Sequence, residues 1–165
     1  MKRNILTFTV TALAISISGA VWSVHAQTTA TVAQKPTIER RVVQLPGTSP
    51  SRAPISPAIV AGDFVFTSGQ IGIDPKTGQM VPGGLEPEAE QVLKNLTAVL
   101  EAAGSSISHV LKATVFLADM NDYAAMNEIY RRHFKQDFPA RSAVQVARLP
   151  ANARIEIEAV ALRKN

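Results

Sequence analysis

The 165-residue sequence contains no cysteine and only three histidines, and these scarcities exclude several kinds of site. Disulfides, thiol nucleophiles and cysteine-ligated metal centres are excluded by the missing cysteine. One histidine lies near the amino terminus, whereas His109 and His133 are far apart in the sequence and lack the spacing of metal ligands. We therefore expect no metal centre, and a fold stabilised by packing or self-association instead of covalent cross-links.

The sequence also has little net charge. Lys2 and Arg3 are two of the 17 basic residues and precede the expected mature chain, which keeps 15 basic and 13 acidic residues, a net charge of +2. So small a charge does not favour binding to nucleic acid. The sequence also lacks the spacing of a phosphate-binding loop and the strand-turn-helix motif of a serine hydrolase. Any chemistry must therefore come from other residues.

The first 26 residues have the composition and order of a secretory signal peptide. Two basic residues precede an apolar stretch over residues 5–21, and Val-His-Ala at 24–26 matches the small-residue cleavage pattern. An uncleaved membrane anchor is the alternative, but the apolar stretch is short for a span and is interrupted by Ser and Thr. We expect cleavage before Gln27 and a periplasmic or secreted protein that has no stable membrane association.

Residues 27–39 are rich in Thr, Ala and Gln, and they are expected to form a flexible leader to a single domain over residues 40–165. Helices are predicted over 86–103 and 123–134, where apolar residues recur at helical spacing. A turn is predicted at 74–78. Strands are predicted over 40–46, 109–118, 141–149 and 154–162. Two further strands are predicted on either side of a turn at Gly62-Asp63, and the second of them covers 64–68.

This order of elements predicts an α+β domain. Strands follow one another at both ends and alternate with helices in between, which is typical of a mixed sheet with two helices on one face. The strands are apolar on both sides. We therefore expect the second face of the sheet to be buried by self-association.

Arg141 begins one of these strands, in the stretch FPARSAVQVARLP. A guanidinium is the side chain best shaped to hold a carboxylate through two parallel hydrogen bonds. An exposed arginine at a strand end, or one in a structural ion pair, is an equally good explanation of the pattern. Arg141 is therefore a candidate clamp for an acidic ligand.

The last predicted strand, RIEIEAVAL, places two carboxylates on the same side as apolar residues. Glu156 and Glu158 alternate with Ile155 and Ile157, and they share their side of the strand with Val160 and Leu162 further on. One interpretation is that they face solvent or pair with neighbouring arginines. The other is a carboxylate held beside a cavity, where its surroundings tune it as a general base.

At these residues the chain resembles the RidA/YjgF family, the reactive-intermediate enamine/imine deaminases. The resemblance covers residues 41–162 and rests on four stretches, which are FTSGQIGIDPKTG, NLTAVLEAAGSSISHVLKATVFLADMNDYAAMNEIYRRHF, FPARSAVQVARLP and IEIEAVAL. It implies a chorismate-mutase-like α+β fold, a homotrimer with active sites between subunits, and neither a metal nor an organic cofactor.

The resemblance also implies roles for individual residues. Arg141 matches the arginine that binds the substrate carboxylate, and Glu156 matches the glutamate that positions the attacking water. Asn127 matches an asparagine that lines the cleft, and Ser68 matches a pocket serine. The implied reaction is hydrolytic deamination of 2-imino or enamine acids to 2-keto acids and ammonia.

Two positions depart from the family pattern. Ile55 stands where the family has a pocket tyrosine, and Ala143 stands where a cysteine is common. Because the tyrosine helps to position water, its replacement supports an alternative hypothesis, a non-catalytic module that binds small carboxylates. An interaction or holdase role on the trimer surface is a third hypothesis. Retention of both Arg141 and Glu156 favours catalysis.

Overall fold

The computed structural model describes residues 37–47 and 53–164. One compact unit spans Ile38–Asn165. The predicted signal peptide and most of the predicted leader lie outside the described residues. No helix within the described residues is long and apolar enough to cross a membrane.

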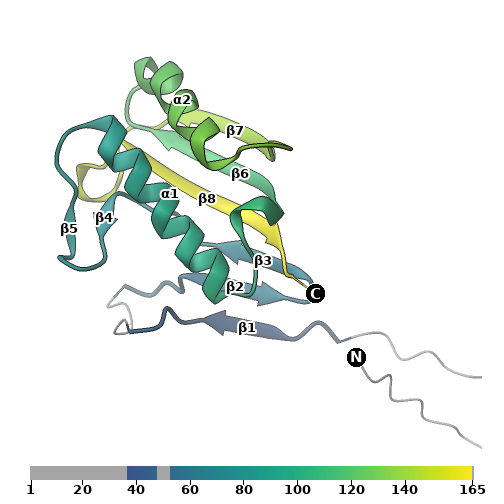
Figure 1. Ribbon diagram of the computed structural model, residues 1–165. Coiled ribbons are helices and arrows are strands. Elements are labelled where there is room, and N and C mark those ends of the chain that lie inside the picture. The colour runs from purple at the N-terminus through teal and green to yellow at the C-terminus, as the bar shows by residue number, and fades with distance from the viewer. Residues whose placement is uncertain (1–36, 48–52, 165) are drawn as a thin grey trace, which may run out of the picture. The chain divides into compact units, whose positions relative to one another are not determined.

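The core of the fold is a six-stranded mixed sheet in the order β1-β2-β3-β8-β6-β7 (Figure 1). Every neighbouring pair is antiparallel except β6 and β7, which are parallel. The strands are β1 (Arg40–Val43), β2 (Ala58–Ala61), β3 (Phe64–Thr67), β6 (Val110–Leu117), β7 (Ala140–Gln145) and β8 (Ile155–Leu162).

Two helices, α1 (Leu85–Ala102) and α2 (Tyr123–His133), cover one face of this sheet (Figure 1). The predicted α+β architecture is therefore confirmed. The apolar stripe of α1, which includes Leu93, Leu96 and Leu100, is buried against the sheet. Each such leucine contributes roughly 1.5–3 kcal/mol compared with an exposed one.

α1 ends just before Gly104, as predicted from the sequence. Gly104 has a φ of 80°, and its N–H donates to the carbonyl of Glu101, while the N–H of Ser105 donates to the carbonyl of Leu100. This pair of hydrogen bonds is a Schellman motif, which requires a left-handed residue after the helix. The helix boundaries lie within one residue of those predicted from the sequence.

β1 ends at Val43 instead of continuing to residue 46, and two further details of the strands differ from the prediction. β7 ends at Gln145 instead of continuing to residue 149, because the chain then turns into a short 3₁₀ helix (Pro150–Asn152) whose Ala151 and Asn152 have positive φ. The predicted turn at 74–78 is part of a small separate hairpin, formed by β4 (Ile73–Asp74) and β5 (Gln79–Met80). None of these changes alters the order of the six main strands.

The register of the sheet decides which side chains share a face. Ala113 of β6 is opposite Ala159 of β8 and Arg141 of β7, and both alanines are buried beneath the helices. Phe116 of β6 is opposite Glu156 of β8. Side chains alternate between faces along a strand, so Arg141 is on the helix side and Glu156 is on the uncovered side.

The face of the sheet without helices carries exposed apolar side chains, as the sequence predicted. Phe64 and Phe66 of β3 are 43% and 45% exposed, and Val42 of β1 and Leu162 of β8 are each 36% exposed. Val42 of β1 and Phe66 of β3 are both opposite Ile59 of the intervening strand β2, and Leu162 of β8 is opposite Phe64. We call this surface the open face.

Candidate functional site

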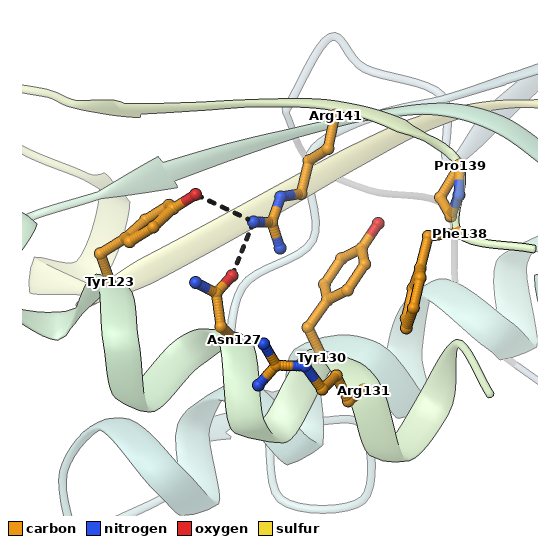
Figure 2. A pocket seen from close by; sticks show the side chains of 7 residues that line it. All are labelled: Tyr123, Asn127, Tyr130, Arg131, Phe138, Pro139 and Arg141. Carbon is orange, nitrogen blue, oxygen red and sulfur yellow. Dashed lines mark hydrogen bonds between the residues drawn. The ribbon is translucent and has the colours of Figure 1, made fainter. Parts of the chain in front are cut away.

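Arg141 lies at the edge of the sheet, and its guanidinium extends over α2 (Figure 2). One of its terminal nitrogens donates to Asn127 Oδ1 at 2.6 Å and to the Tyr123 hydroxyl at 3.3 Å, and the other is 3.6 Å from Met126 Sδ. Its Cζ atom is 4.6 Å from the ring centroid of Tyr130. Helical spacing brings these α2 side chains to the same side of the helix.

These contacts leave the charge of Arg141 without a counterion among the described residues. By contrast, Arg131, Arg132 and Arg154 each form an ion pair with a carboxylate. The partners of Arg141 are an amide, a hydroxyl, a thioether and an aromatic ring. A positioned guanidinium with neutral neighbours is suited to bind an anion.

The guanidinium borders a cavity of about 370 Å³. Three aromatic side chains, a proline and two arginines surround the cavity, and an acidic side chain is missing from its lining (Figure 2). The lining residues are Tyr123, Asn127, Tyr130, Arg131, Phe138, Pro139 and Arg141. Such a cavity fits a small anion with an apolar body.

The two tyrosines of this cavity differ in their electrostatics. Hydrogen bonds with Asn127 and with Arg141 lower the pKa of the exposed Tyr123. Burial raises the pKa of Tyr130 to about 12, and the nearby charge of Arg141 offsets only part of that effect. Tyr130 is therefore a neutral hydroxyl across the physiological pH range.

Glu156 projects from β8 onto the open face, beside Gly69. A β-carbon added to Gly69 would lie 1.8 Å from Glu156 Oε1, so the carboxylate occupies space that only a glycine leaves free. Burial raises the pKa of Glu156, and the charge of Glu158 raises it further. A carboxylate with a raised pKa is better matched to proton transfer near neutral pH.

A second, smaller hollow of about 130 Å³ lies on the open face. Lys112 lines it and donates to Ser142 Oγ at 2.7 Å. The other lining residues are Phe66, Thr67, Thr114, Glu158, Ala159 and Val160. This hollow and the cavity at Arg141 have no lining residue in common.

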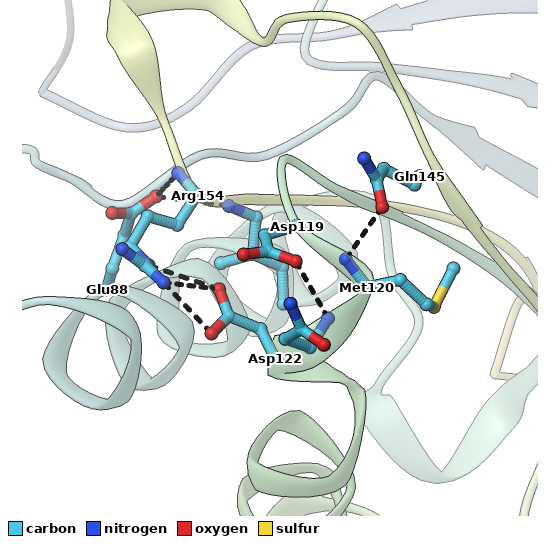
Figure 3. Close-up of polar contacts among 8 residues, drawn as sticks. Glu88, Asp119, Met120, Asp122, Gln145 and Arg154 are labelled. Carbon is cyan, nitrogen blue, oxygen red and sulfur yellow. Dashed lines mark hydrogen bonds and ion pairs between the residues drawn. The ribbon is translucent and has the colours of Figure 1, made fainter.

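The start of β8 is held by a buried carboxylate (Figure 3). Glu88 of α1 is only 4% exposed and accepts hydrogen bonds from the N–H groups of Arg154 at 2.6 Å and Ile155 at 3.3 Å. The guanidinium of Arg154 pairs with both oxygens of Asp122. These contacts fix the backbone directly before Glu156, a role that the sequence pattern did not reveal.

None of the remaining predicted site residues lines the cavity at Arg141. The Ser68 hydroxyl donates to the carbonyl of Ser56 at 2.7 Å and stands next to Gly69, near Glu156. Ile55 is 61% exposed, and Ala143 packs against the core.

Among the predicted site residues, Asn127 is the one that hydrogen-bonds Arg141 and shares its cavity, and Ala143 follows Arg141 on the same face of β7. The structure adds Tyr123, Tyr130 and Phe138 to the site. From the sequence, the two tyrosines were part of a predicted helix and Phe138 was part of the stretch FPARSAVQVARLP. In residues 37–47 and 53–164, no group of three or more His, Asp or Glu side chains is placed to hold a metal.

Comparisons with known proteins extend these observations. The family model described as Endoribonuclease L-PSP matches residues 47–163. A human 2-iminobutanoate/2-iminopropanoate deaminase is 49% identical over 124 residues, which are 75% of this chain and 90% of the relative. A RutC family protein of Pyrococcus horikoshii is 54% identical over 111 residues, 67% of this chain and 88% of the relative.

Solved structures agree with the fold. The crystal structure of Escherichia coli TdcF with bound serine has a TM-score of 0.70 and 38% sequence identity, and it covers 75% of this chain and 99% of its own.

Proposed function

The chain belongs to the family described as Endoribonuclease L-PSP, and from this premise we propose that it hydrolyses 2-imino or enamine acids to 2-keto acids and ammonia. Relatives 44–50% identical to it over most of their length are named 2-iminobutanoate/2-iminopropanoate deaminases. The proposal is supported above all by Arg141, whose guanidinium lines a cavity and whose hydrogen-bond and ring partners among the described residues are all neutral.

In the proposed reaction Arg141 holds the substrate carboxylate through two N–H groups. Asn127, Tyr123 and the ring of Tyr130 keep the guanidinium in place, so little orientational freedom is lost on binding. The iminium carbon is already electrophilic and needs no covalent nucleophile from the protein.

Glu156 is proposed to accept a proton from water as the water oxygen bonds to the iminium carbon. The resulting carbinolamine takes that proton onto nitrogen. Its carbon–nitrogen bond then breaks and releases ammonia. As the carbonyl forms, the hydroxyl passes its proton through Glu156 to the ammonia, which gives a 2-keto acid and ammonium. The raised pKa of Glu156 suits a group that accepts and returns one proton.

We also propose that the active sites lie between subunits of a homotrimer. Arg141 and Glu156 are on opposite faces of their own sheet, so a single chain does not present both to one small substrate. A second copy that places its open face beside the Arg141 cavity supplies the missing carboxylate and buries Phe64 and Phe66. Light scattering of residues 27–165 should give about three times the mass of the chain, and a stable monomer at micromolar concentration would contradict the proposal.

The proposed substrate is a small molecule and not RNA, although the family description names an endoribonuclease. The expected mature chain has 15 basic and 13 acidic residues. A nucleic-acid site depends on several phosphate contacts from a basic surface. The aromatic and basic residues of the Arg141 cavity surround a volume of about 370 Å³, which suits a small molecule.

We also propose that the protein is exported and loses its signal peptide. The basic start, the apolar stretch and the small residues at 24–26 support removal of residues 1–26, with the mature protein in the periplasm or outside the cell and free of the membrane. Amino-terminal sequencing of protein from fractionated cells should give Gln27 as the first residue. An intact chain in the cytosol would overturn this part.

The proposed activity is tested by supplying freshly generated imines of several amino acids to purified residues 27–165 and following the loss of imine. We expect faster hydrolysis than in buffer, and saturation with substrate. Binding of 2-keto acids without any acceleration of hydrolysis would favour the alternative, a non-catalytic module that binds small carboxylates.

A further inference from the structure

Tyr130 is the one described residue with a buried side-chain oxygen or nitrogen that lacks a hydrogen-bond partner. The side chain is 4% exposed and comes from the inner side of α2. Its ring stacks on Phe134, with centroids 4.2 Å apart and an angle of 18° between the ring planes. The guanidinium of Arg141 lies over the same ring, and the ring forms part of the cavity wall (Figure 2).

Phenylalanine would make both of these ring contacts. Stacking on Phe134 and support of the Arg141 guanidinium depend on the aromatic face, not on the oxygen. A buried hydroxyl without a partner destabilises a folded protein, because its hydrogen bonds to water are lost and not replaced. Folding alone therefore gives no reason for tyrosine at this position.

A bound carboxylate would supply the missing acceptor. Resting on the proposed function, we propose that the hydroxyl of Tyr130 donates a third hydrogen bond to the ligand carboxylate that Arg141 holds. Tyr130 and Arg141 line the same cavity, and the guanidinium lies over the Tyr130 ring, so the proposal brings one carboxylate to both side chains. Because the hydroxyl is buried in the ligand-free protein, the proposal includes a movement of a neighbouring side chain as the carboxylate enters.

The chemistry of the hydroxyl suits this role. With a pKa of about 12 it keeps its proton at neutral pH and is always a donor. It adds no charge, so it does not compete with the carboxylate for Arg141. Tyr123 differs, because its hydroxyl is exposed and already bonded to Arg141 at 3.3 Å. In this proposal the hydroxyl of Tyr130 binds the ligand, whereas the hydroxyl of Tyr123 binds Arg141.

The test compares Tyr130→Phe with Tyr123→Phe, since each variant removes one phenol oxygen from the same cavity. The measured quantities are the calorimetric Kd for 2-oxobutanoate and the thermal unfolding midpoint of the ligand-free protein. For Tyr130→Phe we expect a Kd about tenfold weaker, which corresponds to about 1.4 kcal/mol. We also expect an unfolding midpoint higher by a few degrees, because the unpaired hydroxyl is removed. Tyr123→Phe should not raise the midpoint.

Arg141→Lys, measured beside them, separates this inference from the proposed function. If Arg141→Lys weakens binding and Tyr130→Phe does not, the hydroxyl is no ligand donor and the inference is wrong, while the carboxylate clamp stands. An unchanged Kd combined with a lower midpoint would show that the hydroxyl holds only a buried water, and this also overturns it. A parent protein that does not bind 2-oxobutanoate contradicts the proposed function and the inference together.

Discussion

Arg141 and Glu156 project from opposite faces of one sheet. Both β7, which carries Arg141, and β8, which carries Glu156, pair with β6. Their partners on β6, Ala113 and Phe116, are three residues apart. An odd separation along a strand means opposite faces, so the proposed clamp and the proposed base of one chain cannot serve the same substrate. The proposed active site therefore requires a second copy of the chain.

Replacing Arg141 by lysine keeps the positive charge but removes the two-pronged geometry. A charge-assisted hydrogen bond is worth about 1.5–3 kcal/mol, so 2-keto acid affinity and imine hydrolysis should both fall roughly tenfold to a hundredfold. Calorimetry and imine-loss rates measure the two effects. Affinity equal to that of the parent would show that Arg141 is not the carboxylate clamp.

Glu156→Gln should separate binding from catalysis. The amide keeps the size of the side chain but does not accept a proton from water, so hydrolysis should slow by about 10²-fold or more. Affinity for a 2-keto acid should change little, because the carboxylate of the ligand is held by Arg141. The same two measurements apply, and a hydrolysis rate equal to that of the parent would make Glu156 a structural residue.

Gly69→Ala should reduce activity without unfolding the protein, since the new methyl group would occupy the place of Glu156 Oε1, 1.8 Å away. The mobile end of a side chain can move, so the fold should survive while the carboxylate is displaced. Gly72→Ala is the matched control, because its methyl group would meet Cγ of the buried Glu88 at 2.4 Å and the helix backbone at 3.1 Å.

Thermal unfolding and hydrolysis rates distinguish the two glycine variants. Gly69→Ala should lose hydrolysis at an unchanged unfolding midpoint. Gly72→Ala should lower the midpoint, and any loss of hydrolysis should accompany that loss of stability, because Glu88 holds the start of β8. Full activity in a folded Gly69→Ala protein would contradict the assigned position of the Glu156 carboxylate.

The pH dependence of hydrolysis should reflect the raised pKa of Glu156. Its base form is lost as pH falls, so the acid limb of kcat/KM should have its midpoint above the ordinary value of 4.5. Glu158→Gln removes the smaller of the two causes and should move this midpoint to lower pH, while burial still keeps it above 4.5. A limb that does not respond to Glu158→Gln, or that survives in Glu156→Gln, would belong to another group.

The same shift has a consequence for stability. Because the folded pKa of Glu156 lies above the unfolded value, its favourable contribution is present below about pH 4.5 and is lost as pH rises through the folded pKa. Chemical denaturation at pH 7 should therefore show Glu156→Gln to be at least as stable as the parent.

The sequence predicted the helices closely because their signals are local. Pro87 in the first turn, Gly104 after the last and an apolar stripe between them define α1 without reference to the rest of the chain. The predicted end of β7 was wrong because Val146 and Leu149 continue the apolar pattern of the strand. In the structure the N–H of Val146 donates to the carbonyl of Leu117, and the chain then turns away. The hairpin of β4 and β5 has only two residues in each strand, too few for a periodic signal.

The candidate site was only partly predictable for a different reason. Arg141 stands out as a charged residue at the start of an apolar strand, and Asn127 was predicted only through the family resemblance. Tyr130 belongs to a helical stripe that is typical of a core. Alternation within β8 shows that Glu156 and Glu158 share a side. The relation between Glu156 and Arg141 depends on the register of two strands against β6, and register between strands distant in sequence is not written in either strand alone.

Mixing two inactive variants tests whether each active site is shared between two subunits. Arg141→Ala and Glu156→Gln proteins, each nearly inactive alone, are unfolded together in equal amounts and refolded, and imine hydrolysis is measured. If each site takes Arg141 from one chain and Glu156 from its neighbour, random assembly gives about one quarter of the sites both intact residues, so about a quarter of the parental activity should return. Activity no greater than the average of the two separate variants, in mixed assemblies shown to have formed, would contradict a site shared between subunits.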